Sequence, residues 1–167
     1  FESNVPGLFI AGELGGMGLI RNAIEQGRQA VNSIAALDGL RSSNQLDLVI
    51  VGGGPAGLSA ALRLAQLQTQ KGGEPISIAV IEKAREAGAH QLSGALLDPS
   101  TLKELIPDFQ AKGAPLACEV QQDNIYYLTP KKKLRLPITP PPFQNHGNYI
   151  ISLNQFAKWL AAQVEAE

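Results

Sequence analysis

The chain has 167 residues, of which 44% are hydrophobic and 17% are charged, and its formal net charge is −1 at pH 7. This length is enough to bury one sizeable core, or one domain and part of another. The small net charge excludes a global field that would gather nucleic acid or anionic lipid, so any such contact must be local. The single cysteine, Cys118, excludes an internal disulfide and the thiolate set of an iron-sulfur cluster, and we expect a buried, inert thiol.

The apolar runs and the two ends of the chain lead to expectations about where the protein is located and whether it is part of a longer polypeptide. No apolar run reaches the roughly 20 residues that span a bilayer, and no segment has the pattern of a secretory signal. We therefore expect a soluble or peripheral protein on the cytoplasmic or mitochondrial-matrix side. The chain begins at Phe1 and ends at Glu167 within a helical pattern, so we interpret it as a piece of a longer polypeptide.

The first half of the sequence alternates between short apolar runs and helical periodicity. Apolar runs predict strands at residues 8–12, 48–51 and 76–81, each bounded by Gly, Pro or Asn. Apolar residues at helical spacing predict helices at residues 17–37 and 55–70. Strand, helix, strand, helix, strand is typical of an α/β fold with a parallel sheet and right-handed crossovers.

The second half is less regular. Asp98-Pro99-Ser100 predicts the start of a short helix, and residues 119–128 and 134–138 predict a β-hairpin around Thr129-Pro130-Lys131-Lys132. Four prolines within residues 137–142 predict an extended piece outside any sheet. A final helix is expected from Leu153, with Ser152 as its N-cap.

A glycine fingerprint follows the strand at residues 48–51 and opens the next helix. Gly52 permits the tight turn, Gly54 lets a diphosphate approach the backbone, and Gly57 lets the helix lie close to the sheet. Glu82 closes the next strand, where an acidic side chain accepts hydrogen bonds from an adenosine ribose and repels a 2′-phosphate. The pattern predicts a dinucleotide site that disfavours NADP, and it leaves FAD and NAD as alternatives.

Four stretches together resemble the electron transfer flavoprotein-ubiquinone oxidoreductase family: VGGGPAGLSAALRL (51–64), EKAREAGAHQLSGALLDP (82–99), KGAPL (112–116) and NHGNYIISLNQFAKWLAAQ (145–163). The resemblance implies a Rossmann-like FAD-binding fold with a hairpin-containing extension. It implies electron transfer from electron transfer flavoprotein to ubiquinone at a membrane surface, with a 4Fe-4S cluster only in the full-length protein. No catalytic or metal-binding residue is expected in this chain. The FAD-binding residues that we expect are Gly52, Gly54, Pro55, Ala56, Gly57, Glu82, Lys83, Gly88, Ala89, His90, Ser93 and Gly94.

The first 38 residues resemble a different group, the thioredoxin-reductase-like flavoproteins. In that group a closing strand ends in Gly-Asp, whose acid binds the ribitol of FAD, and the corresponding residues here are Gly12 and Glu13. We therefore divide the chain into a closing strand-helix segment (1–38), a linker (39–46) and the beginning of an FAD-binding domain (47–167). We favour two flavoprotein units in tandem, and the alternative is a single domain whose closing strand precedes its opening strand. We expect residues 8–12 to pack beside residues 48–51.

Two other functions remain open at this point. One is an NAD(P)H-dependent FAD oxidoreductase, which the first 38 residues favour, and the other is a nucleotide-binding module without redox activity. Local alternatives also remain. His90 could satisfy only local backbone groups, and Lys131-Lys132-Lys133 could be either a solvated hairpin tip or a contact for an acidic partner or anionic lipid.

Overall fold

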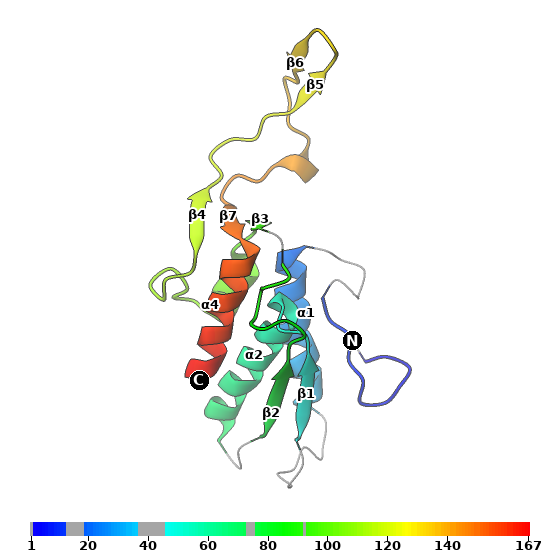
Figure 1. Cartoon of the computed structure of the whole chain (residues 1–167), viewed down its shortest axis with the longest axis vertical. Coiled ribbons are helices and arrows are strands. Elements are labelled where there is room, and N and C mark those ends of the chain that lie inside the picture. Colours follow the sequence, from blue (N-terminus) through cyan, green and yellow to red (C-terminus); the bar gives the residue numbers. More distant parts are fainter. Residues whose placement is uncertain (1, 13–18, 37–45, 73–75, 92) are drawn as a thin grey trace.

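The structure is a computed structural model, which describes residues 2–12, 19–36, 46–72, 76–91 and 93–167 (Figure 1). The chain combines helices with one parallel strand pair and with antiparallel strands. The helices are α1 (Ile20–Ile34), α2 (Pro55–Lys71), α3 (Ser100–Leu105) and α4 (Leu153–Ala166). The strands are β1 (Leu48–Val51), β2 (Ile78–Ile81), β3 (Ser93–Leu97), β4 (Leu116–Glu119), β5 (Tyr126–Leu128), β6 (Lys133–Arg135) and β7 (Tyr149–Ser152).

The unit β1, α2, β2 is the parallel crossover that the sequence predicts. β1 and β2 pair in parallel from Leu48 with Ile78 to Val51 with Ile81. The Asp47 carboxylate fixes the start of this pair by accepting hydrogen bonds from the backbone N–H and the hydroxyl of Ser77, both at 2.9 Å. Leu64 of α2 packs over the strands with Val31 of α1. Because the pair is parallel, the carboxyl ends of β1 and β2 lie side by side, and the glycine loop follows directly after β1.

The strand expected at residues 8–12 is wrong. Phe9 makes only an isolated antiparallel bridge with Glu2. The turn at Val5-Pro6-Gly7 folds the segment back on itself, and the N–H of Ser3 donates to the carbonyl of Leu8 at 2.8 Å. These local hydrogen bonds occupy part of the backbone that a parallel strand would need for pairing with β1.

Residues 7–11 nevertheless lie opposite β1. The two segments line the same largely apolar cavity of about 550 Å³, together with parts of α1 and α2. The exposed fraction of Val51 is 83% and that of Val49 is 46%. The segment is thus near β1, as expected, but it faces the strand across a cavity and forms no ladder with it in the described residues.

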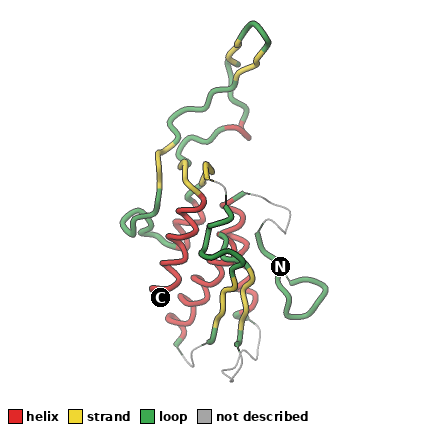
Figure 2. Tube along the Cα trace, in the orientation of Figure 1, coloured by secondary structure: helices red, strands yellow, loops and turns green. Residues whose placement is uncertain are grey.

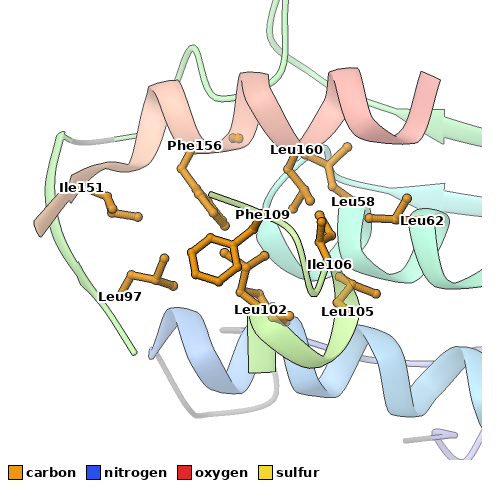
Figure 3. Packing of buried hydrophobic residues seen from close by; sticks show 12 residues of the cluster. Leu58, Leu62, Leu97, Leu102, Leu105, Ile106, Phe109, Ile151, Phe156 and Leu160 are labelled. Carbon is orange, nitrogen blue, oxygen red and sulfur yellow. The ribbon is translucent and has the colours of Figure 1, made fainter. Parts of the chain in front are cut away.

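The main core lies between α4, α2, α1 and the segment around α3 (Figure 3). Its buried members come from distant parts of the chain: Ile24, Leu58, Leu62, Leu97, Leu102, Leu105, Ile106, Phe109, Ile151, Phe156, Ala157 and Leu160. Phe156 and Leu160 lie on α4 at the helical spacing that the sequence predicted. The N-terminal helix α1 therefore shares one core with α2, α4 and the segment around α3.

α1 and α2 approach each other closely at Gly27. A Cβ atom added to Gly27 would lie 2.2 Å from the carbonyl oxygen of Ala56 and 3.2 Å from the backbone nitrogen of Ala60. No side chain fits between the two backbones at this point. This contact anchors α1 beside the first turn of α2.

A three-stranded antiparallel sheet, in the order β3, β7, β4, was not predicted. The expected strand at residues 119–128 is wrong, because β4 ends at Glu119 and β5 begins only at Tyr126. The expectation of a buried thiol is also wrong, since Cys118 is exposed. β4 is an edge strand in which only Leu116 is partly buried, and Cys118 is paired with Ile150, a residue that is itself 43% exposed.

Residues 120–148 form an arm that extends from the body and ends in the β5–β6 hairpin (Figures 1 and 2). The predicted hairpin forms from shorter strands than expected, with Tyr127 opposite Leu134, and the N–H of Thr129 donates to the carbonyl of Lys132 at 2.8 Å. The proline-rich stretch lies outside the sheets, with one 3-10 turn at Pro141–Phe143. Among the helices that the structure describes, none is long and apolar enough to cross a membrane.

Candidate functional site

The glycine loop lies between the end of β1 and the start of α2. Gly52 has φ of 108°, a conformation that glycine adopts without strain, and its N–H donates to the carbonyl of Ile81 at 2.7 Å. Gly54 is the N-cap of α2 and Pro55 is the first helical residue. Because Gly54 has no side chain, no side-chain cap covers the first N–H groups of α2. The positive end of the helix is therefore available to an anion.

Gly57 sets the distance between the helix and the loop. A Cβ atom added to Gly57 would lie 2.1 Å from the carbonyl oxygen of Gly52 and 3.0 Å from a side-chain carbon of Ile50. Contact that close would have to shift backbone, because the nearest obstacle is a carbonyl and not the flexible end of a side chain. Gly57 thus performs the packing role that the fingerprint predicted.

A cavity of about 330 Å³ opens at the N-terminus of α2. Six of the predicted residues line it: Gly12, Gly52, Gly54, Pro55, Ala56 and Gly57. The remaining lining comes from Val51, from Leu19, Ile20 and Ala23 at the start of α1, and from Ala11, Gln91 and Leu153. Glu13, the predicted ribitol ligand, lies outside the described residues. The N-terminal segment therefore contributes a wall of the same cavity as the glycine loop.

Glu82 stands beside this loop at the end of β2. One of its carboxylate oxygens accepts a hydrogen bond from the N–H of Gly53 at 2.7 Å, and the other accepts one from the N–H of Ala84 at 2.8 Å. The Ala84 and Gly53 hydrogen bonds hold the pKa of the Glu82 carboxyl below its usual value of 4.5. A carboxylate offers about four lone-pair sites, so it can still accept hydrogen bonds from a ligand.

The Glu82 contacts predict a dependence of stability on pH. The folded-state pKa is depressed, so the stabilisation is fully present above the unfolded pKa and is lost as the pH falls through the folded pKa. We expect Glu82→Gln to be less stable than the natural chain at pH 7, and this difference to shrink at about pH 3.5. Urea unfolding of both proteins at the two pH values measures it. If the two proteins differed equally in their free energy of unfolding at both pH values, the negative charge of Glu82 would contribute nothing to stability.

The segment Gly88–Gly94 contributes less to the cavity than expected. Gly88 is buried, its carbonyl accepts a hydrogen bond from the Asn154 side chain at 2.7 Å, and an added Cβ would lie 2.6 Å from the Asn154 carbonyl oxygen. This glycine therefore allows close packing against the start of α4. Other members of the predicted set are placed away from the cavity lining: Lys83, Ala89 and His90 are exposed, and Ser93 and Gly94 begin β3 at a bulge.

Residues 47–162, which include the glycine loop, Glu82 and most of α4, match the family described as FAD dependent oxidoreductase. The chain belongs to this family. Since the match begins at Asp47, it does not include Gly12 or α1.

The chain is also similar in sequence to proteins named mitochondrial electron transfer flavoprotein-ubiquinone oxidoreductase. The relative from Dictyostelium discoideum is 54% identical over 126 residues, and that from Mus musculus is 50% identical over 127 residues. Both matches cover 75% of this chain and 20% of the relative. The relative from Caenorhabditis elegans is 44% identical over 131 residues, with 78% of this chain and 22% of the relative covered. The chain spans about a fifth of the length of these relatives.

The residues around the cavity fit the cofactor that the family implies. The loop glycines leave open space at Gly52 and a close but flexible neighbour at Gly54, where an added Cβ would meet only the Gln91 side-chain nitrogen at 3.3 Å. A diphosphate can therefore approach the backbone of the loop. No group of three or more His, Cys, Asp or Glu side chains is placed to hold a metal ion in the parts of the chain that the structure describes.

Two features of the FAD-family site were missed in the sequence. Gly53, the middle glycine of the triplet, is buried and joins the loop to Glu82 through its N–H. Gln91 lines the cavity although it was not among the residues expected as ligands in the segment 88–94 that contains it. The triplet itself pointed to Gly53, but no periodicity or motif distinguishes Gln91 from its neighbours.

Proposed function

We propose that this chain is the FAD-binding part of an oxidoreductase that passes electrons from electron transfer flavoprotein to ubiquinone. One observation carries the proposal: the cavity at the N-terminus of α2 is lined by the family's glycine loop, in a chain about half identical to relatives named for that activity. The relatives are named mitochondrial, and we propose the mitochondrial-matrix or the cytoplasmic side as the location. A 4Fe-4S cluster would belong to the full-length protein.

In this proposal the chain orients FAD through its backbone. The N–H groups at the start of α2 and the positive end of the helix face the diphosphate, and Gly54 allows its approach. Glu82 accepts hydrogen bonds from the adenosine ribose, beside the two that it already accepts. FAD supplies the redox chemistry when bound, and the protein tunes it by hydrogen bonds and by exclusion of water. The β1–α2–β2 unit is, in this proposal, the opening of a Rossmann-like FAD-binding sheet.

The remaining predicted ligands are proposed on weaker geometric support. Gly12 lines the cavity, and its N–H already donates a hydrogen bond to the side-chain oxygen of Gln26 at 2.7 Å. Ala89 and His90 are exposed and would flank the cofactor outside the cavity. Lys83, Ser93 and Gly94 complete the proposed set, and of these Lys83 and Gly94 are not among the described residues that line the cavity.

The arm supports a contact with a membrane surface, where ubiquinone would be reached. Large hydrophobic side chains are exposed along it, including Leu128 at 69% and Ile138 at 75%. Lysines 131–133 stand at the hairpin tip, and the Lys133 ammonium lies 4.2 Å from the centre of the Tyr126 ring. Apolar and basic side chains together suit an anionic lipid surface. Co-sedimentation with phosphatidylglycerol vesicles should fall when Leu128 and Ile138 are replaced by Asp, and unchanged binding would exclude this contact.

A second function is favoured by one specific observation. Gly12 and the start of α1, which lie outside the family match, wall the same cavity as the glycine loop. Their resemblance to thioredoxin-reductase-like flavoproteins supports an FAD protein that is reduced by NAD(P)H. The electron donor therefore separates the two proposals.

The donor experiment uses the FAD-loaded protein under anaerobic conditions. Reduced electron transfer flavoprotein or NADH is added, and oxidation of the donor is followed in time, through the returning flavin absorption of electron transfer flavoprotein or the loss of NADH absorption. The leading proposal predicts oxidation of electron transfer flavoprotein and none of NADH. Oxidation of NADH alone would replace it with the second function, and bound nucleotide without flavin would point to a module without redox activity.

A further inference from the structure

Gln91 occupies a distinctive place in the cavity at the glycine loop. It lies between β2 and β3, and its backbone N–H donates to the carbonyl of Gly88 at 2.9 Å. Among the described residues that line the cavity, Gln91 alone carries a polar side chain. The rest of the lining consists of glycine, proline and aliphatic residues. Of the described lining residues, Gln91 is therefore the one whose side chain can form a hydrogen bond with a ligand.

The Gln91 carboxamide makes no hydrogen bond with the residues that the structure describes. Its oxygen Oε1 is buried and accepts no hydrogen bond from the residues that the structure describes. Its nitrogen Nε2 is directed towards Gly54, 3.3 Å from the position of an added Cβ, and takes part in no hydrogen bond with those residues. Buried polar groups in native proteins are normally paired, so an unpaired one requires an explanation. A purely structural role would require a hydrogen bond that this side chain does not make.

We propose that Gln91 is a cofactor-binding residue whose side-chain N–H donates a hydrogen bond to the FAD diphosphate, from the side opposite the start of α2. The inference rests on the proposed FAD site. The diphosphate would meet no Lys or Arg side chain in the lining, so its charge depends on hydrogen-bond donors and on the helix dipole. A neutral carboxamide supplies such a donor at Gly54, where the fingerprint brings the diphosphate closest to the backbone.

The test separates a binding role from a structural one. Gln91→Met keeps the length of the side chain and removes both polar ends, including the unpaired oxygen. We expect the dissociation constants of FAD and of ADP to rise about tenfold, as for loss of one hydrogen bond to a charged group. The melting temperature without ligand should not fall, because the methionine breaks no hydrogen bond in the unliganded protein. Gln91→Glu places a negative charge beside the diphosphate and should raise the dissociation constants of FAD and of ADP further.

The control variant is Gln155→Met, which changes an exposed glutamine on α4 outside the cavity lining. It should bind both ligands as the natural chain does. Isothermal titration gives the dissociation constants, and thermal unfolding monitored by circular dichroism gives the melting temperatures.

The outcomes distinguish the inference from the function on which it rests. If the natural chain binds FAD and both Gln91 variants bind it equally well, the assignment of Gln91 is overturned and the FAD site stands. Weakened FAD binding with unchanged ADP binding also overturns it, because ADP carries the same diphosphate. A lower melting temperature of Gln91→Met without weaker binding would assign a structural role instead. If the natural chain binds neither ligand, the proposed function fails together with the inference.

Discussion

Replacing Gly57 by alanine is expected to destabilise the chain by at least about 3 kcal/mol and to abolish dinucleotide binding. The added Cβ would lie 2.1 Å from the carbonyl oxygen of Gly52, so the start of α2 must move away from the loop. That movement separates the helix N-terminus from the position where it can stabilise a diphosphate. Urea unfolding measures the stability, and titration with FAD measures the binding.

Gly54→Ala is the matched control for this effect on stability. A Cβ at Gly54 would meet only the flexible end of Gln91 at 3.3 Å, so the fold should retain its stability within about 1 kcal/mol. A larger residue at the same place, as in Gly54→Val, should weaken FAD binding by filling the approach of the diphosphate. Equal stability of Gly57→Ala and Gly54→Ala would contradict the packing role of Gly57.

Replacing Gly27 by alanine is the second substitution with a large expected effect. In an exposed helix the change from glycine to alanine stabilises by about 1 kcal/mol. Here we expect the opposite sign, a loss of about 2–3 kcal/mol, because the added Cβ would lie 2.2 Å from the carbonyl oxygen of Ala56. α1 would then separate from α2, and the wall that Ile20 and Ala23 give to the cavity would shift. Thermal unfolding and FAD titration measure the two consequences.

Ser33→Ala tests the same helix at an exposed position. The Ser33 hydroxyl donates only to the carbonyl of Gln29 in its own helix, at 3.1 Å, so its loss should change the stability by less than about 0.5 kcal/mol. If Gly27→Ala proved as stable as Ser33→Ala, α1 would not pack on α2 as described. The proposed division of the chain at residues 39–46 would then mark two independent units.

Local patterns in the sequence predicted the centre of the site. The glycine loop, β1, α2 and β2 follow from an apolar run, a turn that needs glycine and a helical periodicity, all within 35 residues. The hairpin β5–β6 and the helix α4 follow from equally local signals. In each case the residues that form the element also carry the information that predicts it.

Elements that depend on distant partners were predicted poorly. Residues 8–12 have the apolar character of a buried strand, but hydrogen bonds with residues 2–7 replace the pairing with β1. The sheet β3, β7, β4 joins segments more than 50 residues apart, which no periodicity records. The exposure of Cys118 depends on its place at the edge of that sheet. Gln91 is recognisable only because folding brings it against Gly54.

The most direct test of the FAD site is the visible absorption spectrum of the purified chain, followed by identification of the nucleotide that it releases on denaturation. We expect the absorption bands of a bound flavin, or their appearance after incubation with FAD, and FAD as the released nucleotide. A folded chain that stays colourless and takes up no added FAD would contradict the central claim.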